Sequence, residues 1–319
     1  MGVPMATKPF KTIEEQIGIL RRRGMMVDDS AAQVLMREGY YSIVNGYKAP
    51  FIDRHRTLEC GEDRYKDGTR FDDMLRLFEF DRALRELTFH SLIKAEAAVK
   101  TAVSYCFSDA HRGQDDYLLQ SSFCTREEYE GYGKDPDSYA SELSKLIGLL
   151  GSRRDSNRAE FIVHYREEYG YVPLWVLSND LTFGNLEHFF NLMKPREREA
   201  VCKMISKGTG RIGDKFLGYF DAGKAQVSLE VLVKFRNICA HDERLYCARV
   251  GGRKDVDFSK MVFMLERYLT PKEFYEFLDR FIGMLAKCLD ESEALRPILG
   301  PLGIKRMGDE LGRRRKLIS

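Results

Sequence analysis

The feature that most constrains the fold is a long segment without proline, residues 71–107, whose apolar side chains recur at helical spacing. The apolar positions of this segment include Leu77, Phe80, Leu84, Leu87, Ala95, Ala98 and Ala102. Proline interrupts helices, and the whole chain of 319 residues contains only nine. Other segments can therefore be helical too, and we predict a mainly α fold.

Further helices are predicted along the chain from the same periodicity. Thr12 and Glu15 have the spacing of a capping box, which opens a short helix that ends near Arg21, Arg22 and Arg23. The other predicted helices cover residues 31–38, 139–150, 157–168, 174–193, 195–206, 225–246 and 272–289.

Glycine and charged residues mark the predicted connections between these helices. Residues 109–138 contain Gly113, Gly131, Gly133 and Pro136, so we predict a long loop insertion there. Residues 60–69 are charged and turn-rich, which predicts a linker. Residues 246–256 could form a small hairpin around Gly251 and Gly252.

The predicted domain organisation follows from these elements. Residues 1–68 form an N-terminal helical extension, and residues 69–292 form the main helical domain, with the loop insertion at about 109–138. Residues 293–319 form a basic C-terminal tail that ends in Arg313 to Lys316.

Composition excludes several classes of protein. The hydrophobic fraction of 44% is too high for a disordered chain. No apolar run approaches the ~18 residues that span a bilayer, and residues 1–11 lack the apolar core of a signal peptide. Seven cysteines without a CxxC pair indicate reduced thiols, so a cytoplasmic protein without membrane association is expected. The formal charge of +2 gives no global sign of nucleic-acid binding.

The predicted helix 225–246 carries the residues with the clearest chemical potential. If Phe235 is at the centre of its buried face, the opposite face mixes polar residues with a second apolar stripe, Leu229, Val233 and Ala240. A helix with two apolar stripes is usually packed on both sides. One geometry that satisfies this is a homodimer in which the helix meets its own copy across the second stripe.

Arg236 and His241 flank this second stripe, about 140° apart around the helix. A two-fold dimer would bring two of each into one cleft, which suits RNA cleavage without a metal or cofactor. One imidazole can take the proton from a ribose 2′-OH while the other protonates the leaving 5′-oxygen. Arginine offers a permanent planar charge to the phosphate, and Asn237 could orient the ring or the phosphate.

The spacing of Arg236 and His241 is weak evidence by itself. Arg85 and His90 have the same spacing but lack the following asparagine, and we interpret His90 as a structural, partly buried residue. On spacing alone, a surface arginine and an ordinary helical histidine would be the better interpretation. Asn237, the small residue Ala240 and the second apolar stripe favour a functional site.

The segment Arg236 to His241, continuing to Tyr246, resembles the signature of the Abi-like abortive infection family, which belongs to the HEPN superfamily. Residues 8–24 resemble the N-terminal "KPF-T-EEQI-L--RG" opening of that family, and residues 40–51 resemble its "YY---GY--PF" segment. Phe80-Asp81-Arg82 is similar to the start of its "FDR-LR" helix, and Pro173-Leu174-Trp175 to its "PLW" segment.

This resemblance implies a HEPN helical bundle with an N-terminal helical extension and a role in phage defence. It also implies a homodimeric, metal-independent endoribonuclease in which Arg236 and His241 are the catalytic pair and Asn237 their polar partner. Nothing is carried over to residues 109–138 or to the tail after residue 296.

Several residues have competing interpretations. Cys202, Cys239, His241 and Cys247 have no spacing typical of a zinc site, so no metal site is predicted. Glu96 is more simply paired with Lys100, one turn further on, than positioned to hold Arg236. Trp175 is more often a core residue than a base-stacking platform. The candidates for RNA contact are Arg21, Arg22, Arg23, Tyr40, Tyr41, Tyr47 and Arg244.

Two alternatives to the endoribonuclease stay open. The chain could be an RNA-binding protein in complex with a small structured non-coding RNA, with its HEPN site silent or restrained. It could also be a purely structural dimerisation module, against which the intact Arg236, Asn237 and His241 argue.

Overall fold

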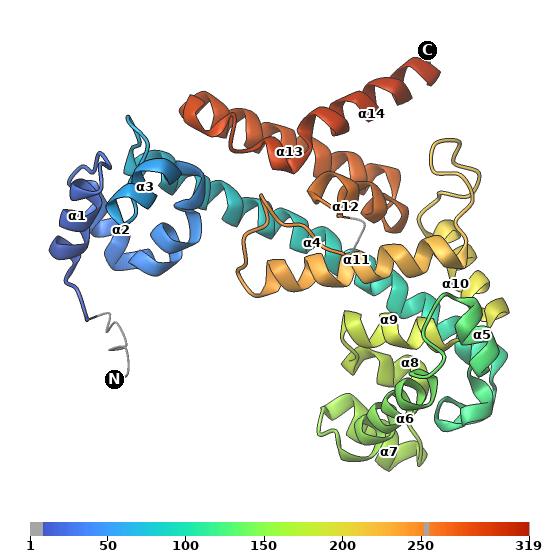
Figure 1. Cartoon of the computed structure of the whole chain (residues 1–319). Coiled ribbons are helices and arrows are strands. Elements are labelled where there is room, and N and C mark those ends of the chain that lie inside the picture. The colour runs from blue at the N-terminus through green and yellow to red at the C-terminus, as the bar shows by residue number, and fades with distance from the viewer. Residues whose placement is uncertain (1–8, 252–254, 319) are drawn as a thin grey trace. The chain divides into compact units, whose positions relative to one another are not determined.

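The computed structural model describes residues 9–251 and 255–318, except for the side chains of Pro301 and residues 313–318 (Figure 1). Within these ranges the chain is helical and contains no strand, which confirms the predicted mainly α fold. None of the described helices is both long and apolar enough to cross a membrane. The α-helices are α1 (Ile13–Arg22), α2 (Ser30–Glu38), α3 (Arg54–Cys60), α4 (Phe71–Ala110), α5 (Arg126–Gly131), α6 (Tyr139–Ser156), α7 (Glu160–Tyr169), α8 (Leu174–Leu177), α9 (Phe183–Leu192), α10 (Pro195–Gly208), α11 (Ala222–Ala240), α12 (Phe258–Leu265), α13 (Pro271–Glu291) and α14 (Ile304–Ile318).

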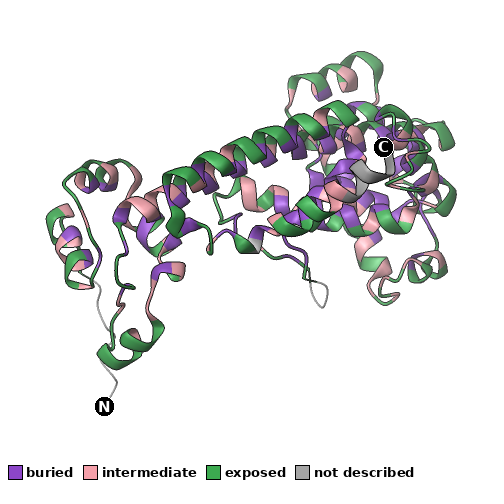
Figure 2. Cartoon of the chain, turned by 90° about the horizontal axis from the view of Figure 1, so that it is seen from above, coloured by how far each residue is buried: buried purple, intermediate pink, exposed green. Residues whose placement is uncertain are grey.

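The chain divides into two compact units. The first unit combines residues 1–84 with residues 281–301, and the second combines residues 85–280 with residues 302–319. The boundary between the units falls within α4 and within α13. In both units the helices bury one side and expose the other, as amphipathic helices do (Figure 2).

The first unit begins with α1, which packs against α2. The predicted capping box is present: the Glu15 amide donates to the Thr12 hydroxyl, and the Thr12 amide donates to the Glu15 carboxylate. At the other end of α2, Arg82 of α4 donates to both Glu38 oxygens, at 2.6 and 3.2 Å. The Arg82 guanidinium also lies 4.5 Å from the centre of the Phe78 ring. This bidentate pair ties α2 to α4.

The charged segment 60–69 is part of the folded unit, so the predicted linker is wrong. The Tyr65 amide donates to the Arg23 carbonyl at 2.9 Å, and the Lys66 amide donates to the Phe51 carbonyl at 2.9 Å. The Tyr65 side chain is buried. The segment is held by these backbone bonds and one aromatic anchor, which charge-rich composition does not reveal.

The second unit is built around α11, which packs against α9, α10 and α12. Val231, Leu232 and Phe235 are buried, as predicted for this face. The Ser228 hydroxyl, also buried on α11, lies 2.6 Å from the Tyr268 hydroxyl. The core of the unit therefore surrounds α11 on more than one side.

Residues 109–138 form a folded segment with short helices, so the prediction of a long loop is wrong. Two 3-10 helices, Asp116–Leu118 and Gln120–Ser122, precede α5, which opens on a capping box between Thr125 and Glu128. The side chains of Tyr117, Phe123, Cys124 and Tyr129 are buried. Gly113 and Gly133 lie in a bend and a turn between the short helices, and the buried aromatic residues anchor the segment.

Two further differences concern helix ends and the tail. The predicted helix 174–193 is two helices, α8 and α9, because Thr182 caps a new start at Phe183. The basic tail contains α14, which packs against α12. Val250 and Val256 form an antiparallel bridge, as in the predicted hairpin, but residues 252–254 at its turn lie outside the described residues, as do the side chains of Arg313 to Lys316.

The Glu38–Arg82 pair predicts a pH-dependent contribution to stability. The hydrogen bonds from Arg82, followed in strength by one from Arg37, lower the pKa of Glu38 to about 2. A lowered pKa stabilises the fold above the unfolded pKa of about 4.5, and this contribution is lost as the pH falls toward 2. Because Arg82 is partly exposed, we expect Glu38→Gln to lower the free energy of unfolding by about 1–2 kcal/mol at pH 7.

Urea unfolding of both proteins from pH 7 to pH 3 measures this difference, which should shrink below pH 4.5. Glu59→Gln, an exposed carboxylate of the same unit, is the control. A Glu38→Gln difference that stays constant with pH, or that Glu59→Gln reproduces, contradicts the prediction.

Candidate functional site

Arg236 lies near the C-terminal end of α11 and points toward α4. Its Nε lies 3.6 Å from a carboxylate oxygen of Glu96, and its guanidinium lies 5.8 Å from the centre of the Phe89 ring. The side chains of Arg236 and Glu96 are only 28% and 14% exposed. The Arg236 Nε is buried and makes no hydrogen bond to any described residue. The arginine is thus restrained between Glu96 and the Phe89 ring, with its buried Nε on the side of Glu96.

Glu96 pairs with Arg236 in the structure, and among the described residues it forms no ion pair with Lys100. The simpler interpretation of Glu96, an ion pair along its own helix, is therefore corrected. Sequence spacing favours a partner one turn away. The actual partner belongs to another helix and can be found only from the packing of α4 and α11.

His241 is the C-cap of α11, so the predicted helix 225–246 ends earlier than expected, at Ala240. The His241 amide donates to the Asn237 carbonyl at 2.9 Å, and the Glu243 amide donates to the Ile238 carbonyl at 3.1 Å. These bonds close a Schellman-type end. Asp242 has a φ of 58°, a left-handed conformation that glycine adopts more readily than other residues.

Arg85 of α4 holds this end in place. Its buried guanidinium donates to the Asp242 carboxylate and, at 3.4 Å, to the Glu243 carbonyl. Aspartate tolerates the left-handed conformation better than most residues, and the ion pair stabilises it further. The role of Arg85 was not predicted from the sequence. An arginine inside an apolar helical pattern was the signal that it needs a buried partner.

The three polar residues of the motif differ in exposure. Asn237 and His241 are both exposed, whereas the Arg236 side chain is half-buried against α4. Because the helix stops at Ala240, the position of the imidazole is set by the turn at Asp242 and not by helical geometry alone. The end of α11 thus presents an amide, an imidazole and a restrained guanidinium within six consecutive residues.

The second apolar stripe of α11 has an explanation within the chain. Leu229 is 1% exposed, and α9 packs against α11, with Val233 about 3.7 Å from the position of a side chain built on Gly184. Leu229 is therefore occupied by its own chain, which corrects its assignment to a dimer interface. Val233 is half-buried and Ala240 is exposed. A dimer across Ala240 stays a prediction.

The arginines predicted to contact RNA in the first unit differ in exposure and in charge pairing. Arg21 donates to the Val27 carbonyl, and Arg23 lies 3.4 Å from Glu62 and 3.5 Å from Asp63, whereas Arg22 is exposed. The charge of this arginine run is thus partly neutralised by its neighbours.

The tyrosines predicted to contact RNA differ in how far they are exposed. Tyr41 is exposed, and Tyr40 is half-buried, with a pKa raised by burial. Tyr47 is buried, and its hydroxyl donates to Asp81 at 2.8 Å. It belongs to the core, so its prediction as an RNA-contacting residue is wrong. In the second unit, Arg244 is exposed.

The cysteines near the motif do not form a ligand cluster. Cys202 is buried, and burial raises its thiol pKa to about 12, while Cys239 and Cys247 are partly exposed. The described part of the chain contains no group of three or more histidine, cysteine, aspartate or glutamate side chains with the geometry of a metal site.

Comparison with known protein families gives one match that covers most of the chain. The family model described as Abi-like protein matches residues 33–247, about two thirds of the chain, and includes the Arg236–His241 motif. The chain therefore belongs to the Abi-like protein family, whose description suggests a role in abortive infection. No curated protein and no solved structure matches the chain at a significant level.

The turn at Asp242 predicts an order of stability for four proteins. Asp242→Asn keeps tolerance of the left-handed conformation and an acceptor for Arg85, and Asp242→Gly keeps only the conformation. Asp242→Ala loses both and should be less stable than Asp242→Gly by about 1–2 kcal/mol. Chemical unfolding should give the order wild type, Asn, Gly, Ala. Equal stability of the glycine and alanine variants would contradict the left-handed turn.

Proposed function

We propose that this protein is a cytoplasmic phage-defence endoribonuclease of the HEPN type that cuts RNA without a metal ion. The observation that carries the proposal is the restrained guanidinium of Arg236, paired with Glu96 and packed near the Phe89 ring, five residues before the exposed His241. Membership of the Abi-like family supports the defence role.

The proposed reaction is attack of a ribose 2′-OH on the adjacent phosphate. One His241 removes the proton of the 2′-OH, and the 2′-oxygen forms a bond to phosphorus. The bond from phosphorus to the 5′-oxygen breaks, and a second imidazole protonates that leaving oxygen. The products are a 2′,3′-cyclic phosphate and a 5′-hydroxyl end. Arg236 donates to the phosphate oxygens, whose negative charge grows toward the transition state.

This reaction needs two imidazoles, and the motif supplies one per chain. A homodimer that joins two copies of the end of α11 would supply the second His241 and a second Arg236. Ala240, exposed beside His241, is the part of the predicted interface that remains at the surface. The proposed site is therefore composite.

Cleavage of RNA by single-residue variants tests the proposal. With EDTA present, purified wild type should cut single-stranded or structured RNA and leave 5′-hydroxyl ends. His241→Ala and Arg236→Ala should each cut about 10²–10⁴-fold more slowly, since each loses a group that acts only in the transition state. Initial rates on an end-labelled RNA measure the effect.

His90 is exposed, so its interpretation as a partly buried residue is wrong. The matched control is His90→Ala, which removes the histidine of the other arginine–histidine pair with the same spacing. Its rate should equal that of wild type. The same rate for wild type and His241→Ala, or cleavage that EDTA abolishes, refutes the proposal.

The dimer is tested at Ala240. Ala240→Arg adds bulk and charge to an exposed position without touching the packing of α9 on α11, so it should yield monomers by light scattering and lose cleavage. Ser144→Arg, which adds the same side chain at an exposed position of α6, is a control that should leave both unchanged. A stable dimer of Ala240→Arg would show that the interface lies elsewhere.

The RNA-binding alternative makes a different prediction for the same preparation. A protein whose site is restrained by a small structured non-coding RNA should co-purify with one dominant RNA and should cleave only after that RNA is removed. Sequencing the co-purifying nucleic acid distinguishes this case, because a free endoribonuclease carries no single dominant species.

A further inference from the structure

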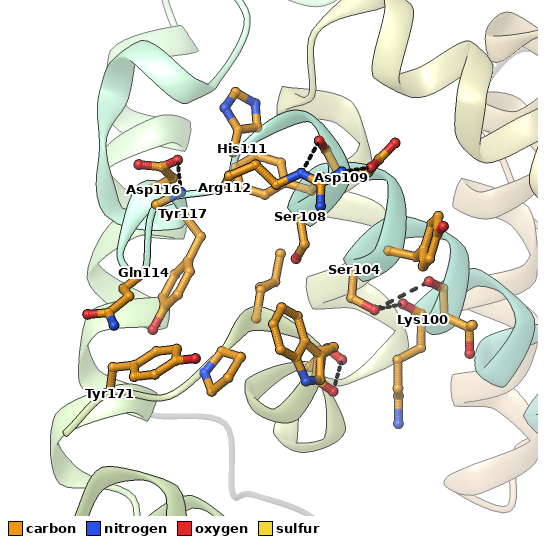
Figure 3. Close-up of a pocket in the computed structure, with 18 of the residues that line it drawn as sticks. Lys100, Ser104, Ser108, Asp109, His111, Arg112, Gln114, Asp116, Tyr117 and Tyr171 are labelled. Atoms are coloured by element: carbon orange, nitrogen blue, oxygen red, sulfur yellow. Dashed lines mark hydrogen bonds and ion pairs between the residues drawn. The ribbon is translucent and has the colours of Figure 1, made fainter. Parts of the chain in front are cut away.

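A cavity of about 730 Å³ opens beside the C-terminal half of α4 in the second unit (Figure 3). Lys100 and Ser104 of α4 line one side, and Gln114 and Tyr171 lie across the cavity from them. The volume is in the range of about 300–1,000 Å³ that is typical of small-molecule sites. None of the residues proposed above as catalytic lines it.

Trp175 gives this cavity an exposed aromatic surface. The other members of α8 are buried, but Trp175 is 54% exposed and lines the cavity. Its interpretation as a core residue is therefore wrong. A large ring exposed from an otherwise buried helix offers a flat surface to a ligand.

The backbone around Trp175 is fixed. The Tyr117 hydroxyl donates to the Val172 carbonyl at 2.8 Å, just before α8. The Trp175 carbonyl accepts from the Ser178 hydroxyl at 3.3 Å and from the Asn179 amide at 3.2 Å. A ring on a fixed backbone loses little freedom when a ligand stacks on it, which favours binding.

The charges that line the cavity leave one cation without a partner. Asp109 is paired with Arg112, and Asp116 accepts from the Gly113 amide at 2.7 Å. Lys100 forms no ion pair with any described residue. A ligand with an aromatic ring and a negative charge therefore matches both Trp175 and Lys100.

Groups that can recognise a nucleobase also line the cavity. The Gln114 amide can donate to and accept from the polar edge of a base, and the Asn179 side-chain oxygen can accept, since its NH₂ group donates to the Trp175 and Val176 carbonyls. Tyr105 and Tyr171 add further aromatic surface. Stacking, an amide edge and a cation are the usual components of sites for unpaired nucleotides.

The cavity is close to the proposed catalytic residues along α4. Lys100 follows Glu96 by four residues, one helical turn or about 6 Å, on the same side of the helix. Glu96 is the partner of Arg236. A strand of RNA with its scissile phosphate at Arg236 could therefore continue into the cavity.

We propose that this cavity binds one unpaired nucleotide of single-stranded RNA, with its base stacked on Trp175 and its phosphate beside Lys100. This inference rests on the proposed function, since it assigns a subsite to the same substrate. It makes the protein selective for unpaired RNA at a defined distance from the cut.

The test uses Trp175 as its own reporter, because it is the single tryptophan of the chain. The full-length His241→Ala protein, which should leave RNA uncleaved, is titrated with a short single-stranded RNA in EDTA while tryptophan fluorescence and RNA anisotropy are followed. Single-stranded RNA should quench the fluorescence saturably, and the matching duplex should not. Wild-type cleavage is measured separately, so failure of the subsite and failure of the nuclease are distinguishable.

Two variants in the His241→Ala background define the contacts. Trp175→Ala should weaken binding about 5- to 150-fold, the effect of losing one stacked base. Lys100→Ala, which keeps the reporter, should weaken binding and reduce the salt dependence of log K by about 0.7. Tyr275→Ala removes an exposed tyrosine outside the cavity and should change neither. Thermal unfolding of each variant verifies the fold.

Quenching by single-stranded RNA that Lys100→Ala weakens and Tyr275→Ala does not supports the subsite. RNA binding without quenching, or equal affinity of Trp175→Ala and its parent, overturns it even if the wild type cleaves RNA. Equal quenching by the duplex overturns selectivity for an unpaired base. Quenching by AMP or UMP that RNA does not displace identifies a free-nucleotide site and also overturns the inference.

Discussion

The site depends on two side chains of α4 that reach the end of α11. Arg85 and Glu96 are eleven residues apart, close to three helical turns, so they project from the same side of α4. Arg85 holds Asp242 and thereby fixes the turn at which α11 stops, and Glu96 restrains Arg236. One helix therefore sets both the direction of the guanidinium and the place of His241. Without these two ion pairs, the residues of the motif would lie on a helix end held only by its own backbone hydrogen bonds.

Ending α11 at Ala240 has a chemical consequence. A histidine inside a helix has its direction fixed by the helix, whereas a C-cap histidine is exposed and depends on the following turn. The second apolar stripe of the same helix is largely covered by α9, so the surface left for a second copy is smaller and closer to His241 than the stripe predicts. The exposed part of the motif and the exposed Ala240 are therefore the same small region of the surface.

Local patterns predicted the parts of the fold that local forces determine. The proline-free segment predicted α4, Thr12 and Glu15 predicted the start of α1, and the periodicity around Phe235 predicted the buried face of α11. The errors have a common cause. Residues 109–138 and 60–69 are rich in glycine or charge, yet a few buried aromatic residues and backbone hydrogen bonds made with distant segments keep them folded. Composition averages over a segment and does not identify which of its residues are anchors.

The sequence by itself determined the helical class, the Arg236–Asn237–His241 motif and the resemblance to the Abi-like family, because periodicity and motif spacing are properties of neighbouring residues. The tertiary structure decided which partner each charge has. It paired Glu96 with Arg236 instead of Lys100, placed Arg85 on Asp242, buried Tyr47 and exposed Trp175. Each of these outcomes depends on helices that are distant in sequence, and a buried charge or an exposed ring is decided by what packs against it.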